Sequence, residues 1–141
     1  MLTEVEGMFA AMLFAISIVA LSQFALYYWR AVLSGVAAQP VSHRVLEAAR
    51  VEGGSLTASD FATLAGLHDL TPDLQPQRSG LSLVRLYFRA IGAMEAVFGG
   101  SLPSVAAWGQ RERAICARYA AVQIDRRLQA NLELAASLRS C

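Results

Sequence analysis

The sequence predicts an all-α protein, with a single N-terminal transmembrane helix followed by a small cytoplasmic helical bundle. Residues 8–29, MFAAMLFAISIVALSQFALYYW, contain no charged residue. At 1.5 Å per residue they would form a helix of roughly 33 Å, enough to cross a hydrocarbon layer of about 30 Å. Beyond residue 40, apolar residues recur at helical spacing, and no β-type alternation is present.

The composition supports this division of the chain. Of the 141 residues, 55% are hydrophobic and 16% are charged, whereas soluble domains average about 45–50% and about 25%. That length has room for one span and about a hundred residues of compact structure. The formal net charge of +1 provides no strongly basic surface, so we expect no nucleic-acid partner.

The end of the apolar run has the composition of a membrane interface. Tyr27, Tyr28 and Trp29 directly precede Arg30, and aromatic rings followed by a cation with a long side chain are favoured at the lipid headgroups. We therefore expect these four residues to anchor the helix at the interface.

Polar residues inside the span suggest contact with another protein. Ser17, Ser22 and Gln23 are the polar residues of the run, and such groups are best satisfied against another helix within the bilayer. They are the predicted intramembrane contacts to integral membrane protein subunits.

The flanking charges predict orientation. No Lys or Arg precedes the span, while Arg30, Arg44 and Arg50 follow it, which places the C-terminal part in the cytoplasm. We expect an inner (cytoplasmic) membrane protein with four parts in the chain. They are a short extracytoplasmic tail over 1–7, the span over 8–29, a juxtamembrane helix extension over 30–40 and a helical cytoplasmic domain over 41–141.

Three other interpretations of the N-terminus were weighed. A signal peptide would begin with basic residues, but the segment MLTEVEG has none, and the cleavage-like residues 36–38 lie beyond Arg30. A type IV pilin would have a basic leader and a glutamate early in its apolar run, and both are missing. A buried soluble helix that is apolar on every face would need a larger protein around it.

Turn and capping residues divide the rest of the chain into four helices. Ser42 is the expected N-cap of the first and Thr57, with Asp60 three residues on, of the second. Pro40, the Thr71–Gly80 loop and the Gly99–Gly100 pair separate the segments. The predicted helices cover residues 43–51, 61–70, 81–98 and 103–138.

The last two helices carry predicted apolar faces. On the helix over 81–98 the stripe comprises Val84, Tyr87, Ile91, Met94 and Phe98. On the last helix the apolar side comprises Ala114, Ala117, Ala121, Ile124, Leu128, Leu132 and Ala135. Its solvated face is predicted to carry Arg111, Glu112, Arg118, Asp125 and Arg126.

Residues able to support catalysis or metal binding are few and scattered. His43, His68, Cys116 and Cys141 show no metal-ligand spacing, so we expect no metal or cofactor. His43 and Glu47 are read as a solvated pair, and Cys116 as a buried apolar thiol. Glu95 borders the apolar stripe and is predicted to be exposed at its edge, with a buried acid paired to an arginine as the alternative.

These observations predict a non-catalytic accessory or assembly subunit of a larger membrane protein complex. Trp108, Arg111, Arg118 and Arg126 are the candidate partner-docking residues, although a solvated helix face would look the same. The alternatives are a membrane-tethered scaffold that recruits a soluble partner, a pilin-like filament subunit and an enzyme. Whether the chain forms an oligomer is left open.

Overall fold

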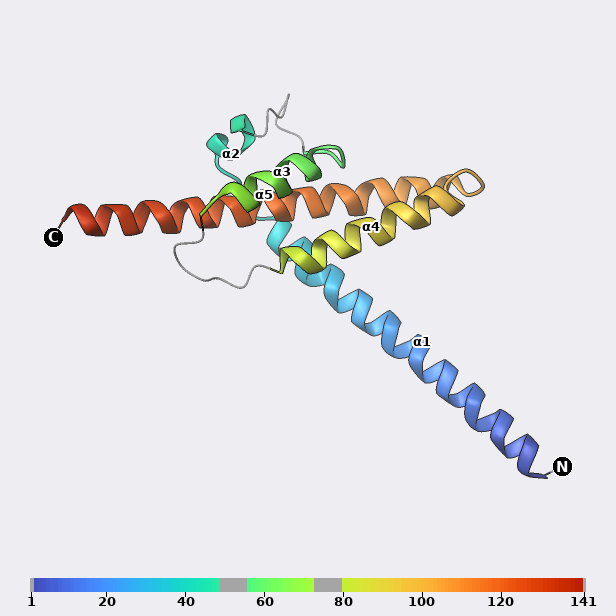
Figure 1. Ribbon diagram of the computed structural model, residues 1–141. Helices are drawn as coiled ribbons and strands as arrows, with labels where there is room; N and C mark the ends of the chain where they lie inside the picture. Colours follow the sequence, from blue (N-terminus) through green and yellow to red (C-terminus); the bar gives the residue numbers. More distant parts are fainter. Residues whose placement is uncertain (1, 49–55, 73–79, 141) are drawn as a thin grey trace. The chain divides into compact units, whose positions relative to one another are not determined.

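The protein is built from helices, as the sequence predicts. The computed structural model describes residues 2–48, 56–72 and 80–140, and in these ranges it contains five α-helices and no strand (Figure 1). Two compact units, residues 1–33 and 34–141, divide the chain. Each unit is described by itself.

Helix α1 covers more of the sequence than the predicted span. It runs from Leu2 to Ala37, so residues 2–7 of the expected tail are helical and most of the predicted extension over 30–40 continues the same helix. The helix ends in a turn before Pro40, as expected, because the ring disfavours helical conformation in the residue before it.

Every residue of α1 from Gly7 to Tyr28 is exposed. The stretch Gly7–Ala37 is long and apolar enough to cross a membrane. Within the described residues of the first unit, nothing covers these apolar side chains.

Two short helices follow in the second unit. Helix α2 covers His43–Ala48; the rest of its predicted range lies outside the described residues. The Ser42 hydroxyl, just before this helix, donates a hydrogen bond to the carboxylate of Asp125 on the last helix. This contact joins two segments that lie far apart in the sequence.

Helix α3 covers Asp60–Leu70, one residue longer than predicted. The backbone N–H and the hydroxyl of Thr57 both donate to the carboxylate of Asp60, at 2.8 and 2.7 Å. The expected N-cap at Thr57 is nevertheless wrong: the N-cap is Ser59, whose side chain makes no capping bond, and the Thr57–Asp60 contacts lie in the turn before the helix. Of the predicted loop over 71–80, residues 73–79 lie outside the described residues.

Helices α4 and α5 form a helical hairpin. Helix α4 covers Leu81–Phe98, as predicted, and α5 covers Pro103–Arg139, one residue more than predicted. At the turn, the Gly99 N–H donates to the Glu95 carbonyl at 2.7 Å.

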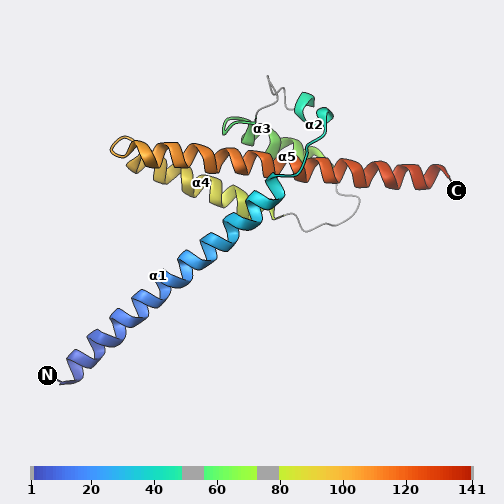
Figure 2. The same cartoon turned by 180° about the vertical axis from the view of Figure 1, so that it is seen from behind.

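Helix α5 is the central element of the second unit. Helices α2, α3 and α4 all pack against it (Figure 2). The buried part of α5 is rich in small side chains, which let neighbouring helices approach closely. Its fully buried residues are Cys116, Ala117, Ala120 and Ala121.

The predicted faces of α4 and α5 are partly wrong. Glu112 and Asp125 are buried, not solvated, because hydroxyl groups from other segments donate hydrogen bonds to their carboxylates. Conversely, Leu132 is 55% exposed and Ala135 is exposed, because the C-terminal part of α5 extends past the helices that cover its centre (Figure 1). On α4, Val84 and Ile91 are buried, but Met94 and Phe98 at the hairpin end are exposed.

Candidate interaction surface

A second apolar stripe runs along the outside of α4. Its members follow one another at steps of three, four, three and four residues, which is the spacing of a coiled-coil seam. Leu83, Leu86 and Val97 are 57, 66 and 69% exposed, and the two alanines between them are exposed as well. We call this set the α4 outer stripe; it comprises Leu83, Leu86, Ala90, Ala93 and Val97.

A small apolar pocket lies at the end of the α4–α5 hairpin. It is lined by Met94 and Phe98 from α4 and by Ser104, Val105 and Trp108 from α5, with a volume of about 290 Å³. Trp108, predicted as an exposed anchor, is half-buried and forms part of this lining. We call this cavity the hairpin-end pocket.

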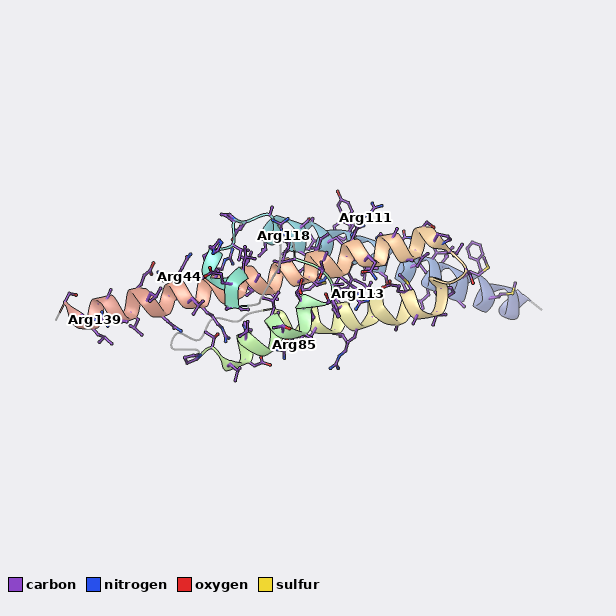
Figure 3. The ribbon with its side chains drawn as sticks, turned by 90° about the horizontal axis from the view of Figure 1, so that it is seen from above. Arg44, Arg85, Arg111, Arg113, Arg118 and Arg139 are labelled. Carbon is purple, nitrogen blue, oxygen red and sulfur yellow. The ribbon has the colours of Figure 1, made fainter. Side chains whose placement is uncertain are left out.

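The arginines predicted for docking are exposed on α5. Figure 3 labels Arg111 and Arg118 on this helix; with Arg126 they complete the predicted set, and all three are exposed. Arg126 donates a hydrogen bond to the side-chain oxygen of Gln39 at 2.7 Å, so part of its bonding capacity is used within the chain.

The neighbouring polar residues of α5 hold the C-terminal end of α3. Arg127 donates to the backbone carbonyls of His68 and Thr71, at 3.2 and 3.3 Å. Asn131 donates to the carbonyl of Pro72 at 3.0 Å. A helix leaves its last carbonyls without intrahelical partners, and these side chains supply hydrogen-bond donors at that end of α3. This part of the arginine-rich face is therefore structural.

Glu95 belongs to a half-buried polar cluster between α4 and α5. Its carboxylate accepts hydrogen bonds from Gln110 at 2.7 Å and from Arg113 at 3.1 Å, and its side chain is only 18% exposed. The prediction that Glu95 is exposed at the edge of the stripe is therefore wrong. The alternative, an acid paired with an arginine, is confirmed.

Arg113 also joins this cluster to an aromatic pair. Its guanidinium, labelled in Figure 3, lies 4.6 Å from the centre of the Phe88 ring. The Phe88 ring stacks on Phe61 of α3, with 4.2 Å between the ring centres. Arg113 thereby links α5 to α4 through a cation–π contact and an ion pair, and Phe88 in turn links α4 to α3.

A groove between α3 and α4 lies beside this aromatic pair. It has a volume of about 440 Å³ and includes Phe61, Phe88 and Arg89 in its lining. At its rim Arg85 donates to the Asp69 carboxylate at 2.6 Å and to the Ala65 carbonyl at 2.9 Å. This guanidinium, labelled in Figure 3, joins the two helices.

The buried titratable groups are poorly suited to react. Burial, with the Glu112 carboxylate nearby, raises the pKa of the Cys116 thiol to about 12, so little thiolate exists near neutral pH. Burial and the cation of Arg127 lower the pKa of His68. His43 and Glu47 form the expected exposed pair, 3.2 Å apart. Within the described residues no group of three or more His, Cys, Asp or Glu side chains could hold a metal ion.

The predicted membrane residues lie on α1. Tyr27 and Tyr28 are exposed, and Trp29 is half-buried beside an exposed Arg30. The Ser17 hydroxyl donates to the Leu13 carbonyl at 2.8 Å, within its own helix. Ser22 and Gln23 are exposed.

Sequence reasoning missed the α4 outer stripe. Its three-and-four spacing is present in the sequence. The neighbouring stripe through Val84 and Ile91 has the same period, and only that stripe is predicted as an apolar face. Comparison with protein-family models, with curated proteins and with solved structures finds no match for this chain. The functional argument therefore rests on the residues themselves.

Proposed function

We propose that this chain is a non-catalytic accessory or assembly subunit of a larger membrane protein complex, anchored by α1. One observation carries the proposal: residues from Gly7 to Tyr28 are exposed along a helix long enough to span a bilayer. Burying such an apolar surface in lipid or against other spans is strongly favourable. The second unit then presents its surfaces to partners held in the same membrane.

The proposed location is the inner (cytoplasmic) membrane, with the second unit in the cytoplasm. Support comes from Arg30 and Arg44, which follow the span, and from Tyr27 to Trp29, whose rings suit the headgroup region. Inside the bilayer, Ser22 and Gln23 are the proposed contacts to a partner helix. Ser17 contributes less, since its hydroxyl is already bonded to α1.

The non-catalytic assignment is supported by the chemistry of the second unit. Its buried thiol, Cys116, has a pKa near 12. Its partly buried acid, Glu95, is bonded to Arg113 and Gln110. Groups bound in this way stabilise a fold and are not poised as nucleophile or general base.

A membrane-tethered scaffold is the second candidate. The observation that favours it is the hairpin-end pocket, where Trp108 and Phe98 could receive an apolar side chain of a soluble protein. In this case the partner would be lost from the membrane on mutation of the pocket.

Purification of the full chain from its membrane in mild detergent tests the proposal. We expect the chain to resist alkaline extraction and to co-purify with integral membrane proteins in fixed stoichiometry. A soluble partner instead would favour the scaffold. Release of the chain by alkali, or its purification without any partner, would contradict the proposal.

A further inference from the structure

We propose that the α4 outer stripe binds an amphipathic helix of a partner subunit, and that this helix carries an acidic residue beside its apolar stripe to pair with Arg89. The inference rests on the proposed function, because it assigns the surface through which the accessory subunit contacts its complex. Three features of α4 lead to it.

The spacing of the stripe fits a helix as occupant. Leu83, Leu86, Ala90, Ala93 and Val97 occupy alternating a and d positions over about four turns. Such positions form the knobs and holes into which a second helix packs. Since these residues are exposed, the seam has no occupant among the described residues of the second unit.

The middle of the stripe is small. Ala90 and Ala93 lie between the larger Leu86 and Val97, so a partner helix can approach closely there and insert bulkier side chains of its own. A face that inserts into a lipid surface instead uses large residues along its length, since its affinity grows with the apolar area that it buries. The alanines therefore favour a helix over lipid.

The charge beside the stripe indicates the partner's chemistry. Arg89 lies one turn from Leu86 and from Ala93, between the stripe and the α3–α4 groove; it is exposed and makes no salt bridge in the part of the chain that the structure describes. The acidic residue of α4, Glu95, is bonded to Arg113. The outer face thus carries a cation without a matching anion, which an acidic partner residue would supply.

The same charge argues against a second copy of this chain. Two α4 helices packed antiparallel about Ala90 would bring Arg89 against its equivalent. Packed in parallel, they would set Arg89, at a g position, against Met94, at an e position. Neither arrangement neutralises the guanidinium.

Site-specific photo-crosslinking in native membranes tests the inference. Ala90→Cys in a Cys141→Ser background would carry a thiol-attached benzophenone, while the buried Cys116 thiol stays unlabelled. Leu138→Cys, at an exposed apolar position far along α5, is the matched control. We expect an adduct from position 90 to a helix of an integral membrane partner, and none to it from position 138.

Substitutions beside the crosslinker decide the chemistry. We expect Leu86→Asp and Arg89→Glu each to lower the adduct roughly tenfold or more, and Arg139→Glu to leave it unchanged. An acid-to-arginine change in the crosslinked helix should restore the adduct with Arg89→Glu. Rescue by that reversal supports the inference.

The other outcomes separate the inference from the proposed function. An adduct to lipid, to a second copy or to a helix without an acidic residue overturns the inference, as does an Arg89→Glu variant that crosslinks normally. A complex that co-purifies intact but gives no adduct at position 90 also overturns it and leaves the proposed function standing. If no integral membrane partner co-purifies at all, both fail.

Discussion

At the residue scale, buried polar side chains in this protein hold helices together. The Arg113 guanidinium contacts the Phe88 ring and the Glu95 carboxylate, which also accepts a hydrogen bond from the Gln110 amide. Arg127 performs a similar task at the C-terminal end of α3. Removing such a group leaves its former partners without compensation, which costs more than the net value of the contact itself.

Arg113→Ala should therefore destabilise the chain by about 1–3 kcal/mol, because Glu95 keeps only its hydrogen bond from Gln110 and Phe88 loses its cation. The exposed Arg111, two residues away, is the matched control, and Arg111→Ala should change stability by less than about 0.5 kcal/mol. Thermal unfolding of both variants in detergent measures the difference. Equal unfolding temperatures would show that the cluster is not structural.

His68 should make stability depend on pH. Burial and the nearby Arg127 lower its pKa, although Asp69 opposes them. The folded state thus favours the neutral ring, and its contribution is fully present above the ordinary value of about 6.5 and declines as the pH falls below it.

We expect the unfolding temperature to fall between pH 7 and pH 5, and His68→Gln to flatten this dependence. His43→Gln, at an exposed position, should leave it unchanged. The measurement is thermal unfolding of the full chain across that pH range. A slope that His43 controls instead would contradict the assignment.

At the element scale, the limits of the two hairpin helices were predictable from local signals, while the burial of Glu112 and Asp125 was not. Gly99, Gly100 and Pro103 are local signals, and they placed both helices of the hairpin to within one residue. Buried Glu112 is bonded to the Tyr87 hydroxyl and buried Asp125 to the Ser42 hydroxyl. Both partners are distant in the sequence, so no local pattern reveals the burial of these two acids.

The same limit explains what was missed at the candidate site. Helix α4 has two apolar stripes of the same period, through Val84 and Ile91 and through Leu83 and Leu86. The spacing alone cannot tell which stripe packs on α5. The contacts of the folded unit decide this, and they leave the outer stripe exposed.

The hairpin turn gives a prediction about an element. A Cβ atom added at Gly99 would clash with the backbone carbonyl oxygen of Glu95, whereas one added at Gly100 would meet nothing. Gly99→Ala should cost about 1–3 kcal/mol through displacement of the turn. Gly100→Ala should be close to neutral. Comparison of the two unfolding temperatures tests this, and an equal effect of both would show that the turn tolerates a side chain.

At the scale of the whole molecule, the chain combines an exposed apolar helix with a separate helical unit held by internal polar contacts. The proposed orientation makes a prediction. Leu138→Cys in a Cys141→Ser background places one exposed thiol in the second unit, while Cys116 is buried with a pKa near 12 and serves as an internal blank. A membrane-impermeant maleimide should label it in inverted vesicles and not in intact spheroplasts, because the proposed orientation, drawn from Arg30 and Arg44, places the second unit in the cytoplasm.

Two controls make the labelling result decisive. The parent Cys141→Ser chain should stay unlabelled until it is unfolded, which confirms that Cys116 is inaccessible. Arg30→Glu with Arg44→Glu removes the positive charges described beside the span, and it should increase labelling in spheroplasts if charge sets the orientation. Labelling of the Leu138→Cys chain in spheroplasts without that change would place the second unit, and with it the α4 outer stripe, on the opposite side of the membrane.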